Sequence, residues 1–388
     1  MAPIEIAQDV HWVGALHPDR KLFDSLIPLP HGTSYNSYLV RGSEKTVLID
    51  TVDPSKAQEL IVNLKTLGVK KIDYVIANHA EQDHSGSLPK ILELYPAAQV
   101  VTNQACRQLL MDLLLIPKEK FIVIKDGEKL SLGSRTLEFM LTPWVHWPET
   151  MFTCLKEERI LFTCDFFGSH SAEGVFPKDK AALYDAAKFY YAEIMMPYAA
   201  FARKALQKAM LADAKIIAPS HGPVYTEPKF IIDAYNQWTS GNGSDVVIPY
   251  VSMHGSTQKM AEYLAQALGK RKITAKLFDL STGDLGAVAS ALVDANVLVL
   301  GTPAYITGPH PQAVYAAYLI NATRPKLKAM AIIGSYGWGA TTVEHLRDML
   351  GDVNAEMLEP VFIRGYPKKE DFELLEKLAD AIAEKEAE

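Results

Sequence analysis

The chain has few of the residues that mark several common classes of protein. Its 388 residues include only three cysteines, with no Cys-x-x-Cys pair, so we expect neither a disulfide framework nor a four-cysteine iron site. Acidic residues outnumber basic ones, and the formal net charge of −7 provides no basic surface for nucleic acid or an anionic membrane. No apolar run approaches membrane-spanning length, and the N-terminal sequence does not resemble a secretory signal. We therefore expect a cytoplasmic protein.

Two kinds of sequence pattern divide the chain. Up to about Ser244, short apolar runs alternate with turns and some helical segments, which favours an α/β sandwich. The polar stretch Ser240–Ser244 has the composition of a flexible linker. After it, continuous apolar runs alternate with helical patterns, as parallel strands do when helices cover both faces of their sheet. We predict two domains, 1–245 and 246–388, the second being a doubly wound parallel sheet of flavodoxin type.

Individual elements can be placed from the same patterns. In the first half we expect strands over 46–50, 74–77, 121–124, 137–141 and 160–163 and a helix over 55–67. In the second half we expect strands over 246–251, 297–300 and 329–333 and helices over 257–268 and 369–385.

The most informative motif follows the strand expected at Tyr74–Ala77. It carries His79, Glu81, Asp83 and His84, which are four potential metal ligands within six residues. Alternate side chains of an extended segment point the same way, and the turn that follows can direct the others to the same point. Imidazoles together with carboxylates suit iron or manganese at least as well as zinc. The alternative is a polar loop that caps the next helix.

Three further segments of the first half end a strand pattern with a metal-capable side chain: His146, Asp165 and His221. A single loop histidine is more often a hydrogen-bonded residue than a ligand, but three such residues in this order favour a binuclear site. Asp165 is suited to bridge two ions, because each of its oxygens can bind one. Strand alternation predicts that its neighbour Cys164 points away from the metals as a small core residue.

Three loops of the second half suit a flavin mononucleotide. The first combines hydroxyls and backbone N–H groups at a helix N-terminus, where a phosphate monoester can bind. Gly-Lys-Ser/Thr and GxGxxG are both missing, which disfavours nucleoside triphosphates and dinucleotides. The other two loops, the later of which runs to Ala340, offer aromatic residues and glycines to an isoalloxazine ring. The expected contacts are Ser252, Met253, His254, Gly255, Ser256 and Thr257, then Thr302, Pro303, Ala304, Tyr305 and Ile306, then Ser335, Tyr336, Gly337, Trp338 and Gly339.

The order of the candidate ligands resembles that of the metallo-β-lactamase fold. Glu81, followed by a flavodoxin-like domain, resembles the flavodiiron proteins, and the resemblance covers essentially the whole chain. It implies an N-terminal αββα sandwich with two non-haem iron ions and a C-terminal flavodoxin-like domain with FMN. It also implies the ligand sets: His79, Glu81 and His146 for one iron, Asp83, His84 and His221 for the other, with Asp165 bridging. A hydrogen bond to a ligand is the alternative role for His84.

The resemblance further implies an oxidoreductase that reduces dioxygen to water, nitric oxide to nitrous oxide, or both. Dioxygen needs four electrons to reach water, and two ferrous ions with a reduced flavin hold four. We expect catalytic roles for Asp165 and His84, and for Tyr198 as a hydrogen-bond donor near the irons, with a core position as the alternative for Tyr198.

Electrons must come from an external donor. A rubredoxin is expected, and a reduced deazaflavin coenzyme or a flavoprotein reductase is the alternative. The resemblance implies a head-to-tail homodimer or a dimer of dimers. The competing function is a di-metal hydrolase of the metallo-β-lactamase fold with an accessory flavodoxin-like domain, in which a metal activates water.

Overall fold

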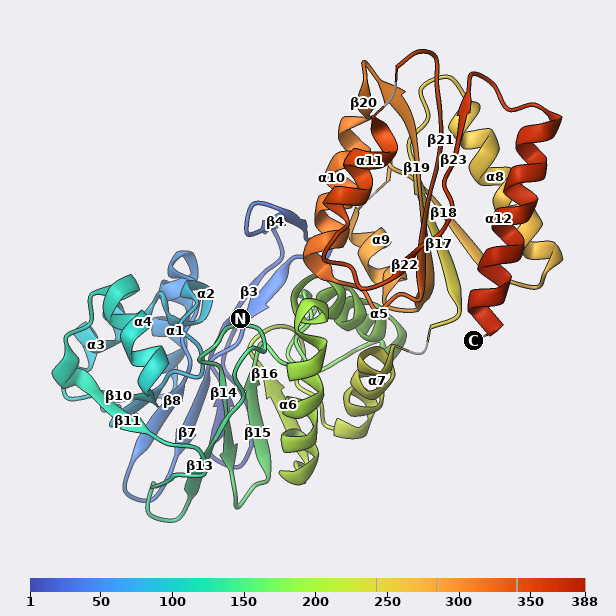
Figure 1. Ribbon diagram of the computed structural model, residues 1–388. Coiled ribbons are helices and arrows are strands. Elements are labelled where there is room, and N and C mark those ends of the chain that lie inside the picture. Colours follow the sequence, from blue (N-terminus) through green and yellow to red (C-terminus); the bar gives the residue numbers. More distant parts are fainter. Residues whose placement is uncertain (242, 284, 340, 388) are drawn as a thin grey trace. The chain divides into compact units, whose positions relative to one another are not determined.

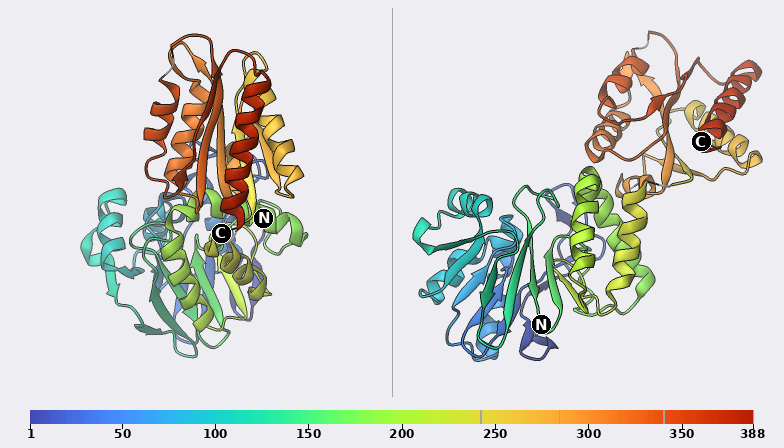
Figure 2. Two further views of the ribbon diagram at one scale, coloured as in Figure 1. Left: turned by 45° about the vertical axis from the view of Figure 1, so that its right-hand side comes forward. Right: turned by 60° about the horizontal axis from the view of Figure 1, so that its bottom comes forward.

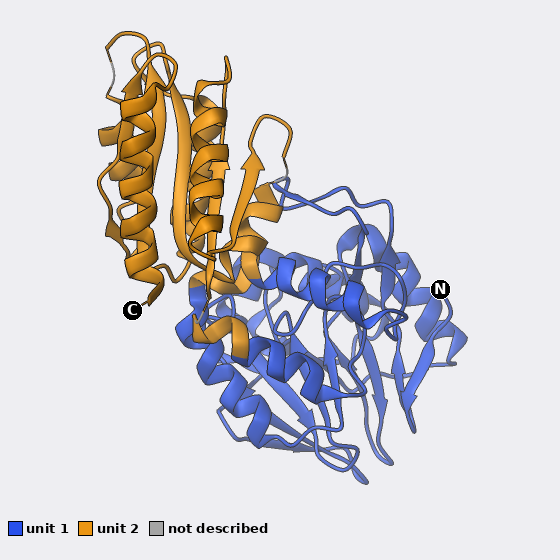
Figure 3. Cartoon of the chain, turned by 90° about the vertical axis from the view of Figure 1, so that its right-hand side faces the viewer, with its two compact units in different colours: residues 1–191, 198–236 blue, residues 192–197, 237–388 orange. Residues whose placement is uncertain are grey.

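The computed structural model describes residues 1–241, 243–283, 285–339 and 341–387 (Figure 1). Asn242, in the predicted linker, and Ala340, in the third predicted loop, lie outside the described residues. The chain divides into two compact units (Figure 3): unit 1 comprises Met1–Tyr191 and Tyr198–Asn236, and unit 2 comprises Ala192–Pro197 and the residues from Gln237 onward. Among the described residues, no helix combines the length and apolar character needed to cross a membrane.

Two sheets form the centre of unit 1. The first has seven strands in the order β1-β2-β7-β8-β9-β10-β11, and the second has five in the order β12-β13-β14-β15-β16. The strands of the first sheet are β1 (Ile4–Ala7), β2 (Val10–Trp12), β7 (Tyr38–Arg41), β8 (Thr46–Ile49), β9 (Tyr74–Ile76), β10 (Gln99–Asn103) and β11 (Phe121–Ile124). Those of the second are β12 (Lys129–Ser131), β13 (Thr136–Leu141), β14 (Met151–Leu155), β15 (Ile160–Cys164) and β16 (Ile216–Pro219).

Shorter elements and helices complete unit 1. Two small ribbons pair β3 (Ala15–His17) with β6 (Thr33–Tyr35) and β4 (Leu22–Phe23) with β5 (Ile27–Pro28). The helices are η1 (Pro54–Lys56), α1 (Ala57–Thr66), α2 (Gln82–Ser85), α3 (Leu88–Leu94), α4 (Gln104–Leu114), η2 (Lys118–Lys120), α5 (Lys180–Tyr190), α6 (Ala199–Leu211) and α7 (Pro228–Ser240). The segment between α5 and α6 forms η3 (Tyr191–Met195) and η4 (Met196–Tyr198), of which Ala192–Pro197 belong to unit 2.

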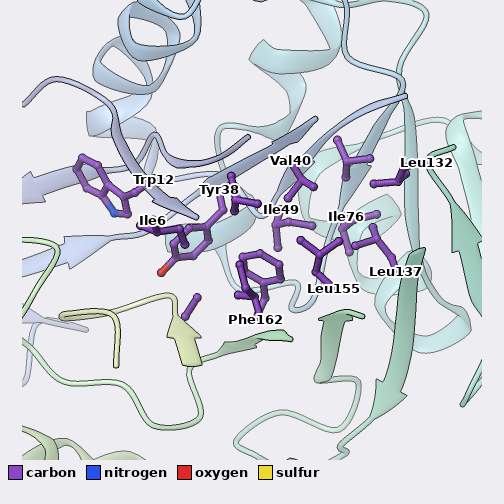
Figure 4. Packing of buried hydrophobic residues seen from close by; sticks show 14 of the residues in the cluster. Ile6, Trp12, Tyr38, Val40, Ile49, Ile76, Leu132, Leu137, Leu155 and Phe162 are labelled. Carbon is purple, nitrogen blue, oxygen red and sulfur yellow. The ribbon is translucent and has the colours of Figure 1, made fainter. Parts of the chain in front are cut away.

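The core of unit 1 follows from the alternation of side chains along its strands. In β8, Val47 and Ile49 face the second sheet and pack with residues such as Phe162 of β15 (Figure 4). Leu48 faces the other way and packs with Leu60 of α1 and with residues of α3 and α4. Each fully buried aliphatic side chain of this kind stabilises the fold by roughly 1.5–3 kcal/mol. Figure 2 shows α5 and α6, in green, beside the second sheet, which completes the helix–sheet–sheet–helix layering.

Unit 2 contains a doubly wound sheet in the order β18-β17-β19-β21-β22, with β23 also pairing β21. These pairings are parallel, and among the described residues of unit 2 only the β19–β20 pairing is antiparallel. The strands are β17 (Asp245–Tyr250), β18 (Ala275–Asp279), β19 (Ala295–Tyr305), β20 (Gly308–Pro309), β21 (Ala329–Tyr336), β22 (Glu356–Met357) and β23 (Val361–Arg364). The predicted parallel architecture is therefore confirmed.

Helices cover both faces of this sheet. Val246 and Ile248 of β17 pack toward α8 (Ser256–Lys270) and α12 (Lys369–Ala387), while Val247 packs toward the opposite layer. The helices of that layer are α9 (Leu285–Leu292), α10 (Pro311–Thr323) and α11 (Thr342–Met349). Burial on both faces explains why these strands read as continuous apolar runs.

Candidate metal centre and flavin site

Strand ends position the candidate metal ligands. His79 and Glu81 lie in the loop after β9, and the short helix α2 then presents Asp83 and His84. The other three follow the ends of β13, β15 and β16: His146, Asp165 and His221. The structure brings all seven residues together in unit 1, in two groups whose ligand atoms lie within 4.8 Å of one another. A third set with the same spacing consists of His84, Asp165 and the sulfur of Cys164.

Asp165 faces histidines of both groups. Its Oδ1 lies 2.9 Å from Nε2 of His84 and 3.4 Å from Nε2 of His221. Its Oδ2 lies 3.4 Å from Nε2 of His79 and 3.4 Å from Nε2 of His146. One oxygen is thus directed to each group, which is the arrangement that a bridging carboxylate requires.

The remaining carboxylates divide in the same way. Oε2 of Glu81 lies 3.1 Å from Nε2 of both His79 and His146. Oδ2 of Asp83 lies 3.1 Å from Nε2 of His221, and Oδ1 of Asp83 lies 3.3 Å from Nε2 of His84. Atoms that each bind one ion at about 2.1 Å are about 3.0 Å apart at right angles and about 3.4 Å apart at a tetrahedral angle. The observed spacings therefore fit two metal positions that share Asp165.

Burial also indicates that a cation belongs in this cluster. Both carboxylate oxygens of Asp83 and Asp165 are buried without a hydrogen-bond partner among the described residues, as are Nε2 of His84 and of His221. Leaving a buried polar group unsatisfied costs roughly 1–3 kcal/mol, and more when the group is charged. Metal ions would satisfy these atoms, and a mixed imidazole and carboxylate set suits iron.

In the absence of metal, the carboxylates hold protons on the histidines. Burial opposes the charge on His79, but hydrogen bonds to Glu149 and Glu81 outweigh it and raise the pKa to about 10. For His146, burial also lowers the pKa, but the hydrogen bonds to Asp165 and Glu81 have the larger effect and raise the pKa to about 10. For His84, the charge of Asp165 outweighs burial and gives a pKa of about 9. Metal ions must therefore displace protons from these rings.

Glu149 is a residue of this centre that sequence patterns did not reveal. It is buried, and its Oε1 lies 2.7 Å from Nδ1 of His79 and accepts a 3.0 Å hydrogen bond from the backbone N–H of Ala80. The sequence feature that could have indicated Glu149 is its position three residues after the candidate ligand His146. For His221, Nδ1 lies 2.7 Å from the backbone carbonyl oxygen of Ser34. Such contacts fix which ring nitrogen faces the metal.

A cavity of about 250 Å³ reaches both metal groups, and its lining includes Phe23, Asp24, Tyr35, Glu81, Asp83 and Trp147. The Tyr35 hydroxyl is buried and has no hydrogen-bond partner among the described residues. Burial raises the pKa of this phenol, so it stays protonated and can donate. Burial also raises the pKa of the Asp24 carboxyl, and the charges of Glu81 and Asp83 add to the effect.

Tyr198 and Cys164 differ from their sequence-based expectations. Tyr198 is half-buried and stacks on Trp144 with ring centroids 6.2 Å apart, and within the described chain it makes no hydrogen bond to the metal cluster. Cys164 is buried as predicted, but the prediction that it points away from the metals is wrong, because its sulfur lies within 4.8 Å of ligand atoms of His84 and Asp165. Regular alternation fails there, since the β15–β16 register shifts and Cys164 has φ +49°.

The predicted flavin loops meet at one end of the sheet in unit 2. β19 continues beyond its predicted end, and its pairing with β21 places Pro303 opposite Ser335. The loops surround a cavity of about 210 Å³ lined by ten of the predicted residues and by Gly365: Ser252, Met253, His254, Ser256, Thr257, Pro303, Ala304, Ser335, Tyr336 and Gly337. The other predicted residues do not line it: Gly255, Thr302, Tyr305, Ile306, Trp338 and Gly339.

Gly365 was missed because it follows a strand that sequence patterns did not identify. Its N–H donates to the carbonyl oxygen of Tyr336, which ties β23 to the third loop. Thr302 is buried, and its hydroxyl accepts from the N–H of His310 rather than facing the cavity. Tyr305 and Ile306 are exposed in the β19–β20 hairpin.

The first loop has the form of a phosphate site. Gly255, with φ +84°, precedes α8, and its N–H donates to the hydroxyl of Ser252 at 3.1 Å. A Cβ at Gly255 or Gly337 would meet no atom within 4 Å, so both backbones are accessible to a ligand. The first-turn N–H groups of a helix have no intrahelical partner and attract phosphate. The cavity is smaller than the roughly 300–1,000 Å³ of typical ligand pockets, so a flavin bound there would remain partly exposed.

Comparison with known families identifies the two parts of the chain. Residues 33–222 match the family described as ODP family beta lactamase, and residues 248–378 match the flavodoxin family. The class defined by fold and site is therefore a metallo-β-lactamase-like domain with a binuclear ligand set, followed by a flavodoxin domain.

Whole-chain similarity gives the family. A nitric oxide reductase from Moorella thermoacetica is 36% identical, over 98% of this chain and 99% of its own length. The rubredoxin-oxygen oxidoreductase from Megalodesulfovibrio gigas is 31% identical, over 99% of this chain and 98% of its own length. The solved structure of rubredoxin oxygen:oxidoreductase from Desulfovibrio gigas has a TM-score of 0.94 at 30% identity, covering 99% of this chain and 98% of that one. The chain belongs to the flavodiiron protein family.

Proposed function

We propose that the chain is an FMN- and di-iron-dependent oxidoreductase that reduces dioxygen to water, nitric oxide to nitrous oxide, or both. The observation that carries this proposal is the position of the Asp165 carboxylate. One of its oxygens faces the two histidines of the first group, and the other faces the two histidines of the second group. The names of the two relatives, a nitric oxide reductase and a rubredoxin-oxygen oxidoreductase, support both substrates. A hydrolase would need neither a flavin domain nor the carboxylate at Glu81.

The seven clustered residues would hold two irons. One set would be His79, Glu81 and His146, the other would be Asp83, His84 and His221, and Asp165 would bridge them. When bound, the irons supply a site where a diatomic molecule can bind and be reduced, and FMN supplies the electrons. The protein's own contribution is to orient the imidazoles and to keep their carboxylate partners ionised and buried.

Tyr35 would take the role of hydrogen-bond donor that the sequence suggested for Tyr198. Tyr35 lines the cavity that reaches Glu81 and Asp83, and its buried hydroxyl has no hydrogen-bond partner among the described residues. At about 250 Å³ this cavity has room for a diatomic gas.

FMN would bind at the three loops of unit 2, with its phosphate at the start of α8. Backbone groups near Gly255 and Gly337 would approach it, and the aromatic ring of Tyr336 would flank the isoalloxazine. We retain the division 1–245 and 246–388 for the two domains, which is supported by family matches that end at 222 and begin at 248.

An external protein or cofactor would reduce the FMN. Rubredoxin is the first candidate, since relatives of this chain carry it in their names, and a reduced deazaflavin coenzyme or a flavoprotein reductase is the alternative. The working assembly would be a head-to-tail homodimer or a dimer of dimers. The cytoplasmic location stays a prediction.

Turnover with reduced rubredoxin tests the function, with a measured amount of dioxygen or nitric oxide added to an otherwise anaerobic assay. The purified protein should be yellow, contain two irons per chain and consume dioxygen, nitric oxide or both. Product analysis should find nitrous oxide from nitric oxide, and no peroxide from dioxygen. A colourless protein that hydrolyses a lactam, thioester or phosphodiester with bound zinc would refute the proposal.

A further inference from the structure

The two groups of candidate ligands differ in what lies behind their histidines. Behind His79, Oε1 of Glu149 lies 2.7 Å from Nδ1, and the whole Glu149 side chain is inaccessible to solvent. The same oxygen accepts the N–H of Ala80. The Glu149 backbone is held separately, because its carbonyl oxygen accepts a 2.6 Å hydrogen bond from the Asn103 side chain. The carboxylate is therefore fixed in place against the ring.

The second group has no comparable carboxylate. Nδ1 of His221 lies 2.7 Å from the neutral backbone carbonyl of Ser34, with the Thr33 hydroxyl at 3.4 Å. Nδ1 of His84 is buried with no hydrogen-bond partner among the described residues. Thus a carboxylate in contact with Nδ1 backs a histidine in the first group. In the second group neither Nδ1 contacts a carboxylate of the described residues, and the buried Asp50 carboxyl interacts with His84 only through its charge.

This difference affects metal binding at the two positions. A carboxylate that accepts the Nδ1–H of a ligating histidine fixes the tautomer and makes the other nitrogen a stronger donor. Charge-assisted hydrogen bonds are also about twice as strong as neutral ones. Each position has one carboxylate of its own, Glu81 or Asp83, and shares Asp165. Glu149 is the carboxylate that contacts Nδ1 of a candidate ligand, and the second group has no equivalent contact among the described residues.

We propose that Glu149 is a positioning residue that makes the two metal positions unequal, so that the ion at His79, Glu81 and His146 is bound more tightly and leaves last. The inference rests on the ligand sets given under Proposed function. It adds an order of metal loading and the residue that causes it.

Equilibrium competition with a chromophoric ferrous chelator tests the order. The anaerobic, FMN-containing protein with two ferrous ions is incubated at increasing chelator concentrations, and the iron retained is measured. The wild type should lose its ions in two steps. Glu149→Gln keeps the size and the hydrogen-bond acceptor but removes the charge, and it should shift the tighter step about 10–100-fold toward lower chelator concentration. The weaker step should move less than twofold.

Glu158→Gln is the matched control. Glu158 is also largely buried and ion-paired, with Arg135 at 2.7 Å, but it lies outside the metal cluster, so both steps should stay within twofold of wild type. Glu81→Gln should weaken the tighter step and Asp83→Asn the weaker one. These two variants test the order even when Glu149→Gln does not fold.

The possible outcomes separate this inference from the proposed function. A single step that releases both irons, a tighter step weakened by Asp83→Asn, or a folded Glu149→Gln that matches wild type would overturn the inference while the di-iron function stands. A protein that binds no pair of irons would instead refute the ligand sets on which both depend.

Discussion

Oδ1 of Asp165 lies 2.9 Å from Nε2 of His84, and both residues are buried. The two come from different sheets of unit 1: Asp165 follows β15 of the second, and His84 lies in α2, which follows β9 of the first. Because the other oxygen of Asp165 faces His79 and His146, one side chain links both metal groups. The centre therefore joins the ends of two sheets whose facing side chains pack in one apolar core.

Asp165→Ala should consequently lose most of both irons. Removing the carboxylate deletes a ligand from each position and leaves four histidines without their shared counter-ion. Elemental analysis against FMN content measures the loss. Asp126→Ala removes an exposed carboxylate that pairs with Lys208, and it should keep both metals. If Asp165→Ala retains two irons, the bridging role is wrong.

Glu81→His should weaken iron binding or activity by exchanging a hard carboxylate for an imidazole at one position. Glu81 lies 3.1 Å from two histidine nitrogens of its group, so the change acts directly on that group. FMN content, measured by absorbance, should be unchanged because the flavin loops belong to unit 2. Loss of flavin together with iron would contradict this independence.

Much of the centre could be predicted because its signals are local. A loop with His79, Glu81, Asp83 and His84 behind an apolar strand is visible in the sequence, and so are single polar residues at later strand ends. Parallel strands of unit 2 were equally clear, since burial on both faces leaves continuous apolar runs.

The remainder depends on contacts between distant segments. Glu149 reaches His79 across 70 residues, and the Tyr35 hydroxyl joins the metal cavity from the β6 end of a small ribbon. Neither has a periodic or motif signal of its own. For Cys164, alternation gave the wrong direction because the register shift and left-handed backbone at the end of β15 are tertiary features.

Metal binding should release protons at neutral pH. In the metal-free protein the pKa values of His79, His84 and His146 are raised to about 10, 9 and 10, so these rings are protonated at pH 7. Each must lose its ligand-atom proton to bind metal, so metal affinity rises with pH and falls on acidification. Titrating metal-depleted, FMN-containing protein with ferrous iron in weak buffer measures the release. An affinity that does not change between pH 6 and 8 would contradict the raised pKa values.

Gly255→Asp should abolish FMN binding while both irons remain. The added carboxylate would lie next to Ser256 and Thr257, which line the cavity at the start of α8, and its charge would repel the FMN phosphate proposed there. Gly68→Asp is the matched control: Gly68 has φ +66°, against +84° for Gly255, and neither glycine has an atom within 4 Å of an added Cβ. Backbone strain is therefore similar in the two variants, and only Gly255→Asp should be colourless. Normal flavin content in Gly255→Asp would place the phosphate elsewhere.

The last prediction concerns assembly. The proposed flavin and iron sites lie in different compact units, and electron transfer between them needs the two cofactors close together. A two-fold, head-to-tail dimer meets this requirement by placing each FMN against the partner's irons. Mixing Gly255→Asp, which lacks flavin, with Asp165→Ala, which lacks iron, should then restore activity after subunit exchange, because a mixed dimer contains one complete pair.

Each parent variant must be inactive alone, and exchange must be verified independently, for instance with two affinity tags. Mixed dimers hold one working FMN–iron pair where wild-type dimers hold two, so their activity should approach half of the wild-type value per dimer. Transfer within one chain predicts that mixed dimers are inactive. One chain would then have irons without flavin and the other would have flavin without irons, so neither chain could pass electrons from FMN to iron. Confirmed exchange without recovered activity would therefore establish transfer within the chain and exclude the proposed cross-subunit path.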